Sequence, residues 1–95
     1  MSYLDRKRVY EHAIDRFGCR AQILMAVEEM SELTKEICKV FRPDCDGNND
    51  RIAEECADVL ITLEQLRMIL GLDEAVAEQM DRKVRRLAEK LEVET

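Results

Sequence analysis

Two pairs of acidic side chains are the residues in this sequence best suited to chemistry. Glu29 and Glu32 form the first pair, and Glu55 and Asp58 form the second. Residues three apart on a helix lie on the same face, one turn above each other. If both segments are helices that pack antiparallel, the four carboxylates converge at one border of their interface. A solvated face rich in glutamate is the alternative interpretation of either pair alone.

Converging carboxylates repel one another unless a cation lies between them. A site made only of oxygen ligands selects a hard divalent cation, here Mg²⁺ or Mn²⁺. Mg²⁺ commonly binds substrate phosphates, and a second ion can activate water. Because phosphoryl chemistry depends mostly on charge and positioning, the pattern predicts a metal site for a phosphorylated substrate.

Four helices are expected to position these residues. They run from near Ser2 to Gly18, from Cys19 to Val40, from about Asp50 to Gly71, and from Asp73 to about Glu92. Ser2 and Asp5 predict a capping box at the first helix, and Asp73 is a candidate N-cap for the last. Short connections between long amphipathic helices predict an all-α fold, an antiparallel four-helix bundle, formed as a single domain over residues 1–95.

Each long helix has an apolar stripe that is expected to face the core. In the second helix the stripe comprises Ile23, Ala26, Met30, Leu33, Ile37 and Phe41. In the third it comprises Ile52, Cys56, Val59, Leu63, Leu66 and Leu70. In the fourth it comprises Val76, Met80, Val84, Leu87 and Leu91.

The third helix has a second apolar face, formed by Ile61, Met68 and Leu72. A helix that is apolar on two faces needs two partners. A chain of 95 residues also has a marginal core of its own. We therefore expect this face to form a subunit interface.

Composition excludes several classes of protein. A net charge of -6 argues against binding duplex nucleic acid. No apolar run is long enough for a membrane span, and residues 1–10 lack the apolar segment of a signal peptide, so a cytoplasmic protein is expected. The four cysteines show no CxxC spacing and His12 is the single histidine, which argues against zinc and favours reduced thiols.

The acidic pairs and their surroundings resemble the MazG-like all-α nucleoside triphosphate pyrophosphohydrolase family. The pattern Glu28-Glu29-x-x-Glu32 is followed by Glu55-x-x-Asp58. The neighbouring text is also similar, namely AIDRFGCRAQILMAVEE at 13–29, AVEEMSELTKEI at 26–37 and EECADVLITLEQL at 54–66. The resemblance covers nearly the whole chain and is greatest to short single-domain members from bacteria and phages.

This resemblance implies a four-helix subunit that forms a homodimer or a dimer of dimers. It implies Mg²⁺-dependent hydrolysis of a nucleoside triphosphate to the monophosphate and pyrophosphate, either to clear unwanted nucleotides or to adjust nucleotide pools. The implied metal ligands are Glu29, Glu32, Glu55 and Asp58. Glu29 and Glu55 are also the implied catalytic residues, with Glu28 in a supporting or water-orienting role.

The fourth helix resembles the basic phosphate-binding stretch of the family. Arg86 matches its arginine, whereas Lys83 stands where larger members often have Asn, and Gln79 stands where they often have Lys. Lys83 can supply the missing charge. Lys35 and Lys39 on the second helix are lesser candidates for phosphate binding.

Two other interpretations remain open. Asp44, Asp46, Asn48, Asp50 and Glu55 have the spacing of an EF-hand calcium loop, but Asn49 occupies the position that needs Gly. The second alternative is a non-enzymatic helical oligomerisation or interaction protein whose acidic face binds a divalent metal.

Overall fold

The computed structural model describes residues 1–43 and 48–92, and it confirms the all-α prediction. Its helices are α1 (Tyr3–Phe17), α2 (Cys19–Lys39), α3 (Asn49–Leu70) and α4 (Asp73–Lys90). Across the described residues there is no β-strand. No helix in these two ranges combines the length and apolar character that a membrane span requires.

The predicted helix boundaries agree with the structure to within about two residues, because the sequence carries the right end signals. The Ser2 hydroxyl accepts from the Asp5 N–H at 3.1 Å, and the Asp5 carboxylate accepts from Ser2, which confirms the capping box. Asn48 caps α3 by accepting from the backbone N–H groups of Asp50 and Arg51. Gly71 ends α3 in the left-handed region, at φ 64°, where glycine is favoured.

The prediction that Asp73 caps α4 is wrong. The cap position belongs to Leu72, whose carbonyl accepts from the Val76 N–H at 2.8 Å and whose side chain cannot cap. The Gly71 turn is so short that α4 begins directly after Leu72. Asp73 is therefore the first helical residue, and its carboxylate lies 3.3 Å from Arg67 on α3.

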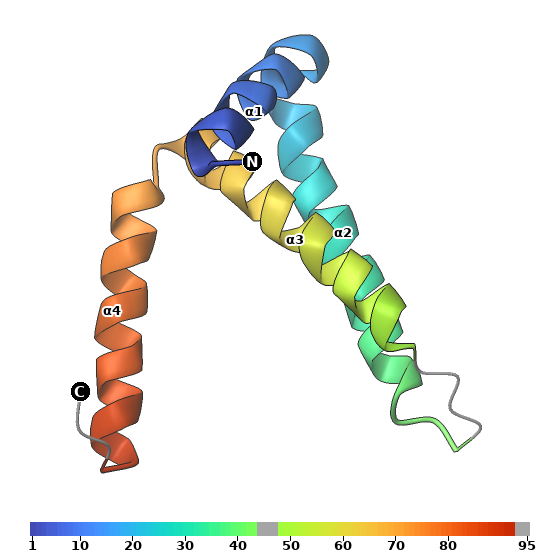
Figure 1. Cartoon of the computed structure of the whole chain (residues 1–95), viewed down its shortest axis with the longest axis vertical. Coiled ribbons are helices and arrows are strands. Elements are labelled where there is room, and N and C mark those ends of the chain that lie inside the picture. Colours follow the sequence, from blue (N-terminus) through green and yellow to red (C-terminus); the bar gives the residue numbers. More distant parts are fainter. Residues whose placement is uncertain (44–47, 93–95) are drawn as a thin grey trace.

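Helices α2 and α3 form an antiparallel hairpin, and α1 crosses the end where α2 begins and α3 ends (Figure 1). Within the hairpin, Gln22 donates a 2.8 Å hydrogen bond from its side chain to Gln65. Helix α1 is held on α3 by Glu64, which accepts hydrogen bonds from Arg6 and Tyr10. These contacts make α1, α2 and α3 one packed unit.

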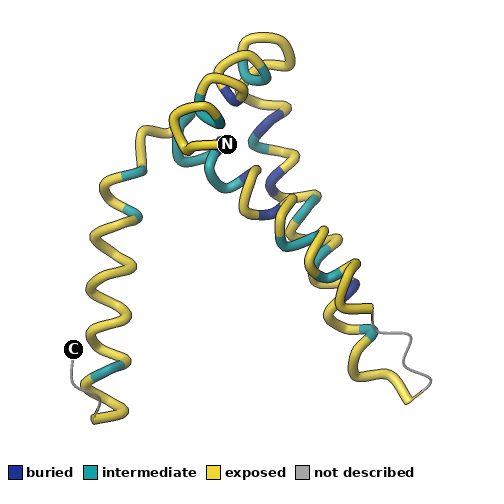
Figure 2. Tube along the Cα trace, in the orientation of Figure 1, coloured by how far each residue is buried: buried dark blue, intermediate teal, exposed yellow. Residues whose placement is uncertain are grey.

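Helix α4 leads away from this unit, and almost all of it is exposed (Figures 1 and 2). No residue of α4 is buried. The predicted inward stripe is therefore wrong for most of its members within one chain: Met80, Val84, Leu87 and Leu91 are 53% to 62% exposed. Helix α4 is amphipathic as predicted, but nothing in the described chain covers its apolar stripe.

The inward face of α2 also differs from the prediction. The side facing α3 carries Gln22, Ala26, Glu29, Leu33 and Glu36, whereas Met30, Ile37 and Phe41 are exposed. The inward positions alternate spacings of four and three residues, which is the narrow seam of a helix packed against a single partner. The predicted stripe shares Ala26 and Leu33 with this seam, and Ile23 is half-buried, but the prediction missed the polar seam positions because it followed apolar side chains. On α3, Val59 is buried and Ile52, Cys56, Leu63 and Leu66 are half-buried, as expected, while Leu70 is exposed.

The single chain is open in shape. Its radius of gyration is 16.5 Å, whereas a compact chain of this length has about 12 Å. Ile61 and Leu72, predicted at a subunit interface, are exposed, and Met68 is half-buried. The fold therefore leaves apolar faces available on α2, α3 and α4.

Candidate metal centre

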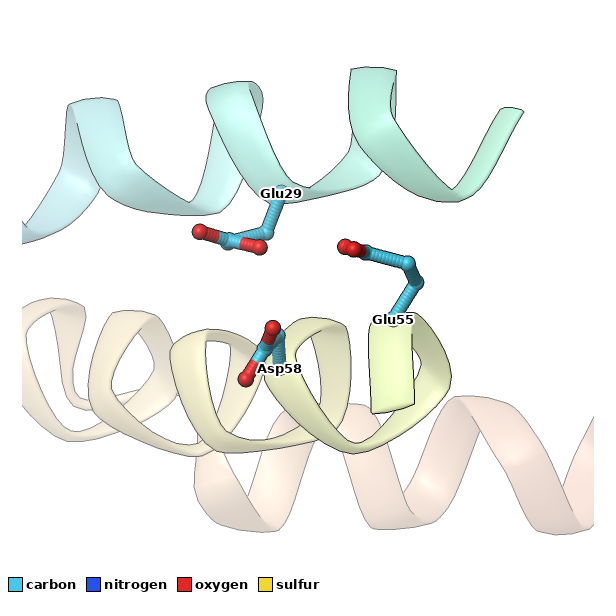
Figure 3. Close-up of side chains that lie close together, drawn as sticks. All are labelled: Glu29, Glu55 and Asp58. Carbon is cyan, nitrogen blue, oxygen red and sulfur yellow. The ribbon is translucent and has the colours of Figure 1, made fainter. Parts of the chain in front are cut away.

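Three carboxylates converge between α2 and α3. Glu29 projects from α2 toward Glu55 and Asp58 on α3 (Figure 3). One oxygen from each of the three lies within 4.8 Å of the others. Glu29 and Glu55 are half-buried, and Asp58 lies at the exposed edge. The structure thus brings together three of the four predicted metal ligands.

Packing between the two helices sets this geometry. Ala26 is only 1% exposed, and its small side chain lets α3 approach α2 closely one turn before Glu29. Val59 is buried next to Asp58 in the sequence. These contacts fix the helix faces, so that the carboxylates meet at the border of the interface.

Burial and like charge both act on the cluster. The pKa of Glu29 is raised above 4.5, first by burial and then by the negative charges of Asp58 and Glu55. The pKa of Glu55 is raised first by burial and then by the charges of Asp58 and Glu32. A cation among these groups would remove the repulsion.

The donor chemistry fits a hard divalent cation. Every member of the cluster offers carboxylate oxygens, the ligands preferred by Mg²⁺ and Mn²⁺. Glu55 Oε2 is enclosed and accepts no hydrogen bond from the described residues. An enclosed oxygen without a donor is unusual in a folded protein, and a bound cation would satisfy it.

The remaining acidic predictions lie near this cluster but outside it. Glu32 is exposed and is not among the three converging groups, although its negative charge raises the pKa of both Glu29 and Glu55. Glu28 is also exposed. Its negative charge also raises the pKa of Glu29.

The predicted phosphate contacts are not gathered around the carboxylates in the single chain. Lys83 and Arg86 lie on α4, which leads away from the hairpin (Figure 1). Lys35 lies on α2, three residues after Glu32. All three side chains are exposed, and none forms an ion pair with another described residue. Lys39 is engaged with Glu36 at 3.0 Å.

Sequence reasoning missed Glu36, a carboxylate in the α2 seam that is only 9% exposed. One oxygen accepts from Lys39, and the other, Oε2, is enclosed with no donor among the described residues. The seam spacing could have revealed it, since Glu36 lies seven residues after Glu29.

The calcium-loop interpretation receives no structural support. Asp44 and Asp46 lie outside the described residues. The Asn48 side chain is engaged as the cap of α3, and Glu55 lies with Glu29 and Asp58.

In comparisons with known proteins, no family model, curated protein or solved structure matches the chain.

Proposed function

We propose that the chain is a divalent-cation-dependent nucleoside triphosphate pyrophosphohydrolase. The observation that carries the proposal is the convergence of Glu29, Glu55 and Asp58 across the α2–α3 interface. The sequence motifs that resemble the MazG-like family contain these same residues. The motifs, rather than the geometry, select pyrophosphate release as the reaction.

The residues of the cluster would hold Mg²⁺ or Mn²⁺ through their carboxylate oxygens. Glu32 is one turn from Glu29, and its exposed side chain can turn toward the cluster as the fourth ligand. The bound ion supplies positive charge to the phosphate oxygens of the substrate. Glu28 is exposed, and the motif assigns it the role of orienting water.

Phosphate binding is assigned to Lys83 and Arg86, with Lys35 on the hairpin itself. Since α4 leads away from the cluster in one chain, assembly or closure has to bring an α4 helix to the carboxylates. Cations there would neutralise the triphosphate that enters the acidic site.

A second copy of the chain is the proposed partner, as a homodimer or a dimer of dimers. The chain exposes 7711 Å², whereas a compact monomer of 11.1 kDa exposes about 5,700 Å². The excess of about 2,000 Å² is of the size that obligate dimers bury. The uncovered stripe of α4 and the exposed Met30 and Ile61 supply apolar surface for this contact.

A reducing cytoplasm is the proposed location. The described cysteines, Cys19, Cys38 and Cys56, are all free thiols. Free thiols, two of them exposed at Cys19 and Cys38, suit a reducing compartment.

The test is a panel of ribo- and deoxyribonucleoside triphosphates, each assayed for pyrophosphate release with Mg²⁺ or Mn²⁺. We expect turnover of at least one triphosphate, lost on removal of the metal and in Glu55→Gln. Glu54→Gln is the matched control, because Glu54 is the exposed neighbour of Glu55 and lies outside the cluster.

No turnover of any triphosphate, together with no cation binding by calorimetry, would contradict the proposal. Cation binding and dimerisation without turnover would instead support the non-enzymatic interaction protein.

A further inference from the structure

A pocket of about 360 Å³ opens at the corner of the fold where α1 ends and α2 begins. Its lining consists of Phe17, Ala21, Gln22 and Met25. Pockets that bind small molecules have volumes of about 300–1,000 Å³ and mostly apolar walls. Phe17 and Met25 are 60% and 38% exposed, so the pocket offers an aromatic ring and a thioether. Both groups make favourable contacts with a flat aromatic ligand.

Gln22 is the one polar residue among the four that line this pocket, and it is only 9% exposed. Its side-chain nitrogen donates to Gln65 on α3 at 2.8 Å. Its side-chain oxygen, Oε1, accepts no hydrogen bond from the described residues and is not among the fully enclosed atoms. Buried polar groups are normally paired. Because the nitrogen is held by α3, the unpaired oxygen is a fixed acceptor available to a ligand in the pocket.

The pocket lies in line with the carboxylate cluster. Ala21, Met25 and Glu29 follow one another at intervals of four residues on α2, so they run along one side of the helix. At 1.5 Å per residue, Met25 precedes Glu29 by about 6 Å along the helix axis, and Ala21 precedes it by about 12 Å. An extended nucleoside triphosphate separates its base from its phosphates by a distance of this order. One nucleotide can therefore occupy the pocket and reach the carboxylates.

We infer that this pocket binds the base of the nucleotide, and that Gln22 Oε1 accepts a hydrogen bond from an N–H on the edge of the base. Phe17 and Met25 supply the contacts to the faces of the ring, a sequence-tolerant source of affinity because every base has such faces. Selection among bases then falls to the single fixed acceptor. The inference rests on the proposed function, since it assigns the base of the same substrate.

Filling the pocket tests the assignment of the base. Ala21→Trp places a large side chain at an exposed lining position, and Arg20→Trp places the same side chain at the exposed neighbour outside the lining. We expect Ala21→Trp to raise KM about tenfold to hundredfold, the loss that corresponds to one stacked base. Its Mn²⁺ affinity should be unchanged, because the carboxylates are intact. Arg20→Trp should keep the wild-type KM.

A wild-type KM in Ala21→Trp overturns the inference. It is also overturned if Ala21→Trp changes the mass in light scattering without changing KM, because the pocket would then belong to a subunit contact.

The role of Gln22 is tested with a substrate analogue whose base-edge N–H is replaced by N-methyl, such as N3-methyl-UTP or N6,N6-dimethyl-ATP. We expect the wild type to discriminate against this analogue by about tenfold or more in kcat/KM. Gln22→Leu combined with Gln65→Leu removes the acceptor together with its partner and should abolish the discrimination. Urea denaturation establishes that this double variant is folded. Undiminished discrimination in the folded double variant would show that Gln22 is structural and would overturn its role.

The ¹³C signal of the Met25 methyl group provides a readout that does not need turnover, and Met25→Leu assigns it. We expect a nucleoside triphosphate to shift this signal in the wild type and not in Ala21→Trp. A shifted signal without turnover contradicts the proposed hydrolase and leaves the base pocket intact. Turnover with shifts confined to other methionines overturns the inference alone. Neither turnover nor a shift overturns both.

Discussion

The side chain of Gln22 donates a 2.8 Å hydrogen bond to Gln65 across the α2–α3 interface, where both residues are buried. Seven residues separate Gln22 from Glu29, and seven separate Asp58 from Gln65. In an antiparallel pair these equal offsets place Glu29 opposite Asp58. The amide pair therefore sets the register that brings the carboxylates together.

Replacement of one amide should be costly, and replacement of both should be tolerated. Gln22→Leu leaves the Gln65 side chain buried without its donor, and we expect a loss of about 1–3 kcal/mol in the free energy of unfolding. Gln22→Leu combined with Gln65→Leu removes both polar groups and should recover most of this loss. Urea denaturation measures both. A double variant that loses the sum of the two single losses would show that the pair has another role.

Removal of the negative charge of Glu55 should stabilise the metal-free protein. A carboxyl group whose pKa is raised by folding binds more protons in the folded state, so its contribution to stability falls as the pH rises above 4.5. We therefore expect Glu55→Gln to be more stable than the wild type at pH 7.5 in a chelator, with the difference shrinking toward pH 4.5. Thermal unfolding across this range measures it.

Addition of Mg²⁺ should reverse this order, since a ligand at 100 times its Kd stabilises the wild type by about 2.7 kcal/mol and the variant lacks a ligand group. Glu54→Gln, altered at an exposed site, should follow the wild type within about 0.5 kcal/mol. A Glu55→Gln protein that is less stable than the wild type in chelator would contradict the electrostatic account.

The contribution of Glu64 to the stability of the fold should have the opposite pH dependence. Burial alone would raise its pKa, but hydrogen bonds from Arg6 and Tyr10 outweigh burial and hold the pKa below 4.5. A lowered carboxyl pKa stabilises the fold above that value, and the contribution is lost as the pH falls through the folded pKa. Glu64→Gln should therefore cost about 1–3 kcal/mol at pH 7 and little in strong acid.

The exposed Glu11 on α1 supplies the control for Glu64, because Glu11→Gln should change the unfolding free energy by less than about 0.5 kcal/mol. Equal losses in the two variants would mean that the Arg6 and Tyr10 contacts contribute nothing specific.

The α4 stripe should control assembly. Val84→Glu places a charge in the uncovered apolar stripe and should convert the proposed dimer to monomers, as measured by light scattering at micromolar concentration. Arg82→Glu puts the same side chain outside that stripe and should leave the mass unchanged. A wild-type protein with a mass of 11.1 kDa in solution would be a monomer and would contradict the proposed dimer.

The helices and the acidic pairs could be predicted because local chemistry determines them. The Ser2 capping box, Gly71 and the spacing of the carboxylates act within a few residues of each other in the sequence. The inward face of α2 could not be read from apolar residues, because its seam contains Gln22, Glu29 and Glu36. These polar groups are placed by their partners on α3, which depend on the register.

The direction of α4 could not be predicted from the sequence either. The spacing of Met80, Val84 and Leu87 establishes an amphipathic helix, but an apolar stripe does not specify which surface covers it. The short turn at Gly71 and the contact between Arg67 and Asp73 orient α4 away from the hairpin. The positions of Lys83 and Arg86 relative to the carboxylates depend on that orientation.

Phosphorus NMR of a nucleoside triphosphate incubated with the protein and Mg²⁺ tests the central claim most directly, because it identifies the bond that is cut. We predict equal amounts of nucleoside monophosphate and pyrophosphate, with no product from Glu55→Gln or Asp58→Asn. A diphosphate with inorganic phosphate, or a triphosphate that remains intact across the whole substrate panel, would contradict the proposed function.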